Sequence, residues 1–144
     1  RMALQLGHVI IVTNAMESWV EKASKKFMPS VDVIKDIPII YARSGRVSRF
    51  EQDDDTAPLL CKEGAFEEEI LKFYGPGKKE RHVVSIGDAT YERDALHRVA
   101  LRRHITYTKT VKLLDAPRIE DFVKHLDLLS EHLRYILRHE EHVD

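Results

Sequence analysis

The sequence predicts an α/β fold, a three-layer α/β/α sandwich built around a mostly parallel sheet. Short runs of β-branched and other apolar residues alternate along the chain with amphipathic stretches of helical period. Residues 8–14 include four consecutive β-branched residues and end on threonine and asparagine, which is typical of a buried parallel strand. Strands separated by helices favour a parallel sheet with helices on both faces. Because no repeat or linker divides the chain, we expect residues 1–144 to form a single domain.

The N-terminal stretch predicts a helix end, a strand and an amphipathic helix. Residues 2–6 have the pattern of last helical turns, closed by Gly7 in a left-handed conformation. A helix that starts at the first residue has no cap, so we expect the chain to be cut from a longer protein. After the strand at 8–14, apolar residues at steps of three and four predict a helix over 15–27, capped by Asn14.

A second strand is predicted at residues 37–42, followed by a polar connection. Pro38 cannot donate to a strand ladder, so this strand should start late or lie at an edge. Residues 43–58 are polar and without a clear period, and they predict an exposed loop or hairpin. The acidic run Asp53–Asp55 within them is expected to be solvated, because blocks of like charge are normally exposed.

The second half of the chain continues the alternation of helices and strands. Glycine and proline mark the end of its first helix, and a proline is expected at the first-turn position of its last helix, where the missing N–H costs nothing. The predicted elements are a helix at 64–74, a strand at 82–88, a helix at 91–103, a strand at 107–114 and a long helix from Pro117 to about His139.

Composition and charge exclude several classes of protein. With 43% hydrophobic and 33% charged residues, the chain is globular and not disordered. Its formal net charge of -1 provides no overall positive field, so we expect no nucleic-acid partner. No apolar run is long enough for a membrane span, so no membrane association is expected. The single cysteine, Cys61, cannot form an internal disulfide and is expected to be a buried, inert thiol in a cytoplasmic protein.

Polar residues that follow two of the predicted strands are candidates for a binding site. In an open parallel sheet, ligands bind beyond the carboxyl ends of the strands. Thr13 and Asn14 hold that position after the first strand, and Gly87 and Asp88 hold it after the third. Thr13 and Asn14 can equally be helix caps, because both residue types are common there.

Acidic residues gather after the third strand. Asp88, Glu92 and Asp94 lie within seven residues, and carboxylate oxygens of this kind suit a hard cation such as Mg²⁺. Glu92 is four residues from Asp88 and would face back toward it from an early helix turn. Asp94 is the alternative second carboxylate.

Three positions, in their order along the chain, resemble motifs of the haloacid dehalogenase (HAD) superfamily of phosphohydrolases. The second motif of that family is a threonine or serine that ends a strand, and Thr13 matches it. The third is a lysine that opens a helix, matched by Lys62, and the fourth is an acidic pair after a strand, matched by Asp88 and Glu92. The resemblance covers residues 8–94 and implies a HAD-like, Rossmann-like sheet.

The resemblance implies a role for each matching residue. Thr13, with its neighbour Asn14, would bind the phosphoryl oxygens of a substrate, and Lys62 would neutralise charge on the nucleophile and the transferring group. Asp88 and Glu92 would hold Mg²⁺, which shields the phosphate from an attacking carboxylate. Without the family, a lone lysine such as Lys62 would be expected in solvent.

The family's first motif, which carries the nucleophile, is not found. It is a strand ending in Asp-x-Asp-x-Thr or Val, and Asp53–Asp55 has its threonine one place too early and no apolar strand before it. The resemblance therefore implies a fragment that lacks the N-terminal strand of the family's sheet and is inactive alone. Its parent would hydrolyse a phosphate monoester, or transfer phosphoryl, from a small molecule or a phosphoprotein through an aspartyl intermediate. The alternative is a non-catalytic HAD-like protein that binds or scaffolds a partner.

The last helix, expected within residues 117–140, carries an apolar seam of heptad type. Its first half should pack on the sheet, and its second half, from Glu131, should overhang and pair with a second subunit as a homodimer. His132 and His139 would flank that interface, and their protonation would weaken it. The seam consists of Ile119, Phe122, Leu126, Leu129, Leu133 and Ile136, widened by Val123 and Leu137.

Overall fold

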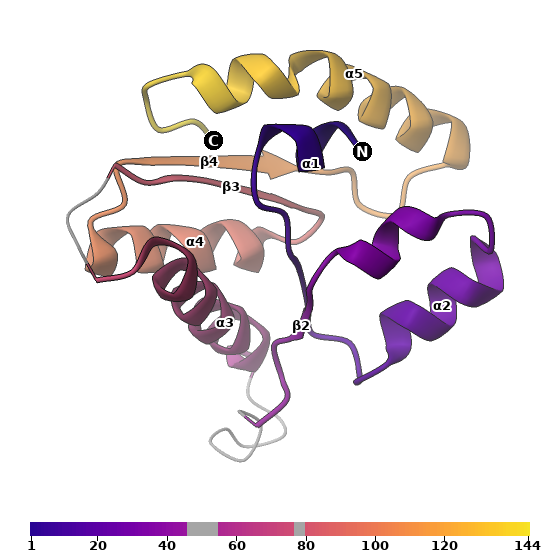
Figure 1. The fold of residues 1–144 in the computed structure, drawn as a ribbon, viewed down its shortest axis with the longest axis horizontal. Helices are drawn as coiled ribbons and strands as arrows, with labels where there is room; N and C mark the ends of the chain where they lie inside the picture. Colours follow the sequence, from indigo (N-terminus) through magenta and orange to yellow (C-terminus); the bar gives the residue numbers. More distant parts are fainter. Residues whose placement is uncertain (46–54, 77–79) are drawn as a thin grey trace. The chain divides into compact units, whose positions relative to one another are not determined.

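A computed structural model of the chain describes residues 1–45, 55–76 and 80–144 (Figure 1). It has a mixed α/β structure in which the strands pair in parallel. The chain divides into two compact units, residues 1–65 and residues 66–144, which are described separately. The single domain expected over the whole chain stays a prediction.

The first unit contains one pair of short parallel strands. Thr13, at the end of the first strand, lies opposite Tyr41 at the end of the second. Apolar residues of both strands pack against Ala42, Ala65 and Cys61, and Cys61 is buried as expected for an inert thiol. The elements are α1 (Met2–Leu6), β1 (Ile11–Thr13), α2 (Trp19–Phe27), the 3₁₀ helix η1 (Asp32–Asp36), β2 (Ile39–Tyr41) and the first part of α3 (Ala57–Tyr74).

Two expectations for the helix ends of this unit are wrong. Gly7 is extended, with φ −177°, and not left-handed, although its amide still donates to the Ala3 carbonyl at 3.0 Å. Asn14 does not cap the following helix, since α2 begins only at Trp19, after Ser18. The Asn14 amide instead donates to the carbonyl of Pro58 in α3, at 3.1 Å.

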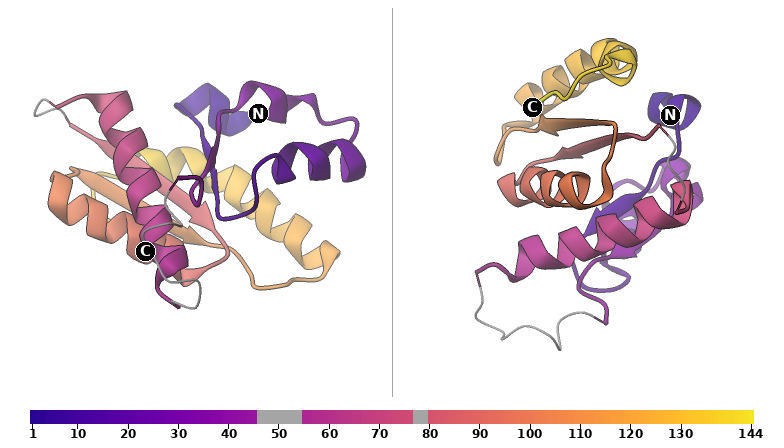
Figure 2. Two further views of the ribbon diagram at one scale, coloured as in Figure 1. Left: turned by 90° about the horizontal axis from the view of Figure 1, so that it is seen from below. Right: turned by 90° about the vertical axis from the view of Figure 1, so that its left-hand side faces the viewer.

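The second unit is layered. Its two strands pair in parallel along their whole length, from His82 opposite Tyr107 to Gly87 opposite Lys112. Helix α4 covers one face of this pair and α5 lies over the other, as Figure 1 and the right-hand view of Figure 2 show. The elements are the end of α3, β3 (His82–Gly87), α4 (Thr90–Arg103), β4 (Tyr107–Lys112) and α5 (Ile119–Arg138). The buried core consists of Ile70, Leu96, Val99 and Ile105, with Phe66, Tyr74, Val83 and Ala100 packed against it.

One buried arginine ties together the ends of two helices in this unit. Arg81, only 6% exposed, donates to the carbonyl of Gly75 at 3.0 Å and to that of Arg103 at 3.3 Å. Gly75 ends α3 in the left-handed conformation (φ 72°), where glycine avoids the Cβ clash. Arg81 thereby satisfies one carbonyl at the end of each helix, at the point where β3 begins.

The strands form two sheets and not one. In the described part of the chain, β1 pairs with β2 and β3 pairs with β4, and no ladder joins the pairs. The parallel direction expected for the sheet is confirmed, but a three-layer HAD sandwich around one sheet is not shown. Hydrophobic pattern predicts where strands lie and gives little information on which strands become neighbours.

The packing of α5 reverses the prediction for its two halves. Leu133, in the half expected to overhang, is only 7% exposed, while Ile119 and Val123 in the first half are 79% and 50% exposed. The reason is that residue 143 returns alongside β4 and holds the C-terminal end of the helix against the sheet. A second expectation for this helix is wrong. Pro117 does not lie in its first turn but before its N-cap, which is Arg118. Like the other described helices, α5 does not combine the length and apolarity that crossing a membrane requires.

Candidate functional site

Lys62 and the end of β1 meet inside the first unit. Lys62 stands on α3, fifty positions from β1 in sequence, and its Nζ donates to the carbonyl of Val12 at 2.5 Å. The next residue, Thr13, ends the strand, and its Oγ1 accepts the N–H of Ala15 at 3.1 Å. Because that bond uses an oxygen lone pair, the Thr13 hydroxyl proton can still be donated to a ligand.

The environment of Lys62 contradicts the expectation of a solvated lysine. Its side chain is 4% exposed, and it lies within α3, which begins at Ala57, and not at the helix start. Removing an ammonium from water costs several kcal/mol, so a lysine is rarely kept in such a place for stability alone. The burial, together with the contact at the end of β1, makes Lys62 a candidate for charge stabilisation.

Asn14 adds a second polar group beside Thr13. Its Nδ2 donates to the Pro58 carbonyl at 3.1 Å, while its Oδ1 is buried and has no hydrogen-bond partner among the residues that the structure describes. A buried acceptor without a donor costs about 1 to 3 kcal/mol. The end of β1 therefore offers one unused acceptor as well as the Thr13 hydroxyl.

Asp88 directly follows β3 in the second unit. Its side chain is exposed, as expected for a ligand-binding position beyond the carboxyl end of a parallel strand. A Cβ on Gly87 would lie 1.5 Å from Oε2 of Glu92, so a larger residue at this position would displace the Glu92 carboxylate. The sequence Gly87-Asp88 therefore reflects close packing between the strand end and the first turn of α4.

The two candidate second carboxylates have other partners. Glu92 Oε2 accepts the N–H of Ala89 at the start of α4, at 3.4 Å, and thus caps the helix. Asp94 Oδ1 lies 3.2 Å from Nε of Arg93, in a pair that is about half exposed on both sides. Glu92 is the one that lies beside the strand end, so the geometry favours it over Asp94.

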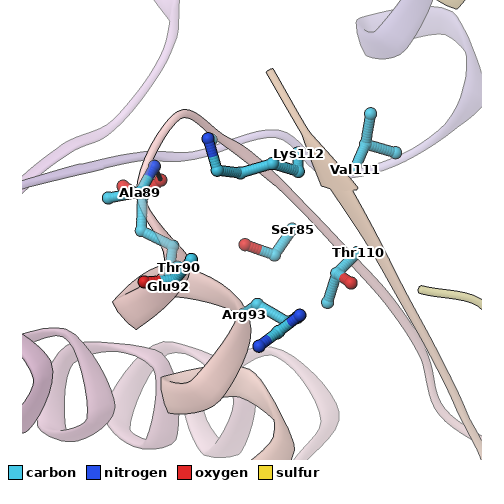
Figure 3. A pocket seen from close by; sticks show the side chains of 9 residues that line it. Ser85, Ala89, Thr90, Glu92, Arg93, Thr110, Val111 and Lys112 are labelled. Carbon is cyan, nitrogen blue, oxygen red and sulfur yellow. Dashed lines mark hydrogen bonds between the residues drawn. The ribbon is translucent and has the colours of Figure 1, made fainter. Parts of the chain in front are cut away.

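A small cavity of about 50 Å³ opens at the carboxyl ends of β3 and β4, beside the first turn of α4 (Figure 3). Ser85, Thr90 and Thr110 line it together with the cationic side chains of Arg93 and Lys112 and with the acidic side chain of Glu92. Hydroxyls and cations suit a small anion. Glu92 lines the cavity but Asp88 does not, so the cavity does not bring the two expected metal ligands together.

The sequence interpretation named Gly87 and Glu92 but missed the other residues of this cavity. Ser85 and Thr110 are small polar residues inside β3 and β4, and such interruptions of an apolar run were the available signal. The cations are already compensated in part, because Lys112 Nζ lies 2.7 Å from Oδ1 of Asp115 and Arg93 pairs with Asp94.

The donor set fits Mg²⁺ only as a weak site. Mg²⁺ keeps several water ligands and is commonly held by one or two carboxylates plus a substrate phosphate. Asp88 can supply one such carboxylate, and Glu92 is committed to the helix start. Among the described residues, no group of three histidine, cysteine or acidic side chains could hold a metal ion.

The predicted site residues thus form two groups. Thr13, Asn14 and Lys62 lie close together in the first unit, and Asp88 and Glu92 do so in the second. Searches against protein-family models, curated proteins and solved structures find no match for this chain. The convergence of the two groups on one ligand stays a prediction. Of the acidic run Asp53–Asp55, residues 53 and 54 lie outside the described part of the chain.

Proposed function

We propose that this chain is the phosphoryl-binding part of a Mg²⁺-dependent phosphohydrolase of HAD type. The observation that carries the proposal is the buried ammonium of Lys62 at the end of β1, beside Thr13. A lysine and a hydroxyl at the carboxyl end of a parallel strand are suited to hold the oxygens of a phosphoryl group. The substrate class is a phosphate monoester, on a small molecule or on a protein, in the cytoplasm.

The residues of the chain have separate tasks in such a reaction. The Thr13 hydroxyl donates to one phosphoryl oxygen, and the Lys62 ammonium balances the charge that accumulates during transfer. Asp88 holds the metal ion, which when bound polarises the phosphate and screens its charge. Each of these groups stabilises the transition state, and none of them attacks phosphorus.

The attacking carboxylate comes from outside these 144 residues in this proposal. Its oxygen forms a bond to phosphorus as the ester P–O bond breaks, and the leaving alkoxide takes a proton from a general acid that this proposal likewise places outside the chain. Water then cleaves the acyl phosphate, which releases inorganic phosphate and restores the carboxylate. The chain on its own would therefore bind a phosphoryl group without turning it over.

A phosphate-release assay tests the proposal. The full-length protein that contains this chain is expected to release phosphate from at least one member of a panel of sugar phosphates, nucleotides and phosphopeptides, in a Mg²⁺-dependent manner. Asp88→Asn should abolish the release, while Asp127→Asn, a control on the exposed side of α5, should not change it. Release that survives Asp88→Asn would contradict the proposed role.

A non-catalytic scaffold is the second candidate. It is favoured by one sequence observation, the lack of a nucleophile motif of the form Asp-x-Asp-x-Thr or Val at the end of an apolar strand. A full-length protein that folds, binds phosphate with Mg²⁺ and hydrolyses no member of the panel would support this alternative.

A further inference from the structure

The residues after α5 form a short strap along β4. Residue Val143 pairs with Lys109 in parallel, on the edge of β4 that does not face β3. Its N–H donates to the Thr108 carbonyl at 3.0 Å, and its carbonyl accepts the N–H of Thr110 at 2.8 Å. Figure 1 shows the chain turning back beside β4 after the helix ends.

Besides these two backbone bonds, the Thr110 hydroxyl donates to Oδ1 of Asp144, and one histidine nitrogen also holds the strap. The backbone N–H of Thr108 donates to Nδ1 of His142 at 3.1 Å, and the Thr108 hydroxyl lies 2.7 Å from the same atom. A ring nitrogen that accepts an N–H carries no proton, so this contact needs the form of His142 whose proton is on Nε2. Thr108 is 4% exposed, so water has little access to its amide if this acceptor is lost.

We propose that His142 is an acid-sensitive latch, and that its protonation releases the strap of residues 140–144 from the edge of β4. A proton on Nδ1 turns the acceptor into a donor, which leaves the backbone N–H of Thr108 without an acceptor even where the Thr108 hydroxyl accepts the new proton. Release would expose the N–H and C=O groups of β4, the kind of edge that can pair with a further strand.

Other charged groups lie around the latch, and at acid pH some of them would hold the strap in place and oppose its release. His97 of α4 lies 3.2 Å from Oδ1 of Asp144, and its protonation would strengthen that contact at acid pH. His139 pairs with Glu141 at 3.4 Å within the strap region, and Lys109 of β4 interacts with Glu140. The His97 pair is about half exposed, and exposed pairs contribute little to stability. The loss of the buried acceptor therefore outweighs it, and acid pH releases the strap.

Hydrogen exchange of the Thr110 amide tests the latch, because this amide donates to the strap and not to His142 itself. In the chain as it stands, its protection factor is expected to fall about tenfold or more between about pH 7.5 and about pH 5. In His142→Ala it should be low at both pH values. His139→Asn and His97→Asn are matched controls that remove the other two histidines, and both should keep the fall.

Two results would overturn the proposal. The first is a Thr110 protection factor that stays the same at both pH values in the unmodified chain. The second is a pH-dependent fall that persists in His142→Ala, or that disappears in His97→Asn, because either would place the titrating group elsewhere. Circular dichroism of each variant at neutral pH separates strap release from general unfolding.

Discussion

Replacing Lys62 by methionine is expected to lower phosphate-ester hydrolysis by the full-length protein by about 10² to 10³-fold, the usual effect of removing one preorganised charge-stabilising group. Methionine has a similar length and fills the same buried space beside Val12, so the fold should persist. The measurement is kcat with the best substrate of the panel, together with the melting temperature.

Lys72→Met is the matched control for that prediction. Lys72 stands on the same helix, ten positions further on, and its side chain is 75% exposed in a loose pair with Glu69. We expect its replacement to leave kcat unchanged. Equal activity in Lys62→Met and Lys72→Met would show that the buried ammonium has no part in the reaction.

Replacing Lys109 by methionine is expected to stabilise the protein by about 1 to 3 kcal/mol, because it removes a buried amine that is poorly compensated. Lys109 is fully buried in β4, and its Nζ has no hydrogen-bond partner among the described residues. The Tyr107 ring, 5.2 Å from Nζ, provides the one cation–π contact found for it in that part of the chain. The measurement is urea unfolding at neutral pH, with the exposed Lys124→Met as control.

The same residue predicts how stability changes with pH. Burial lowers the pKa of Lys109 below the ordinary value of 10.5, and the attraction of Glu140 only partly opposes this. The unfolded chain therefore binds more protons between the two pKa values, so the free energy of unfolding should rise as pH increases toward 10.5 and then level off. Lys109→Met should remove this rise. A variant that is less stable than the unmodified protein, with the rise retained, would contradict the account.

The second half of the fold could be predicted closely from the sequence. The strand over His82–Gly87 is an apolar run closed by glycine, and α4 and β4 follow with clear periods, so their ends differ from prediction by at most two residues. The start of α3 at Ala57 was missed, although Pro58 in its first turn is a recognised start signal. The orientation of α5 could not be predicted, because it depends on the tertiary pairing of Val143 with β4.

The site could be predicted in part. The polar residues at the strand ends correctly indicated where Thr13 and Asp88 lie. Thr13 is the last residue of one parallel strand, and Asp88 directly follows another. The burial of Lys62 could not be predicted, since a lysine stem can cover apolar surface with its ammonium in water. Glu92 was expected as a metal ligand, and its bond to the Ala89 amide shows that a glutamate in a first turn also serves as a helix cap.

The most direct test of the proposed site is whether Thr13 and Lys62 lie near a metal ion held by Asp88. Mn²⁺ prefers the same oxygen ligands as Mg²⁺ and broadens the NMR signals of nearby nuclei. Titration of the chain with Mn²⁺ should broaden the amide signals of Thr13, Asn14 and Lys62 together with that of Asp88, and Asp88→Asn should abolish the broadening at all four. Broadening confined to Asp88 and its neighbours in α4, or unchanged in Asp88→Asn, would contradict a shared phosphoryl site.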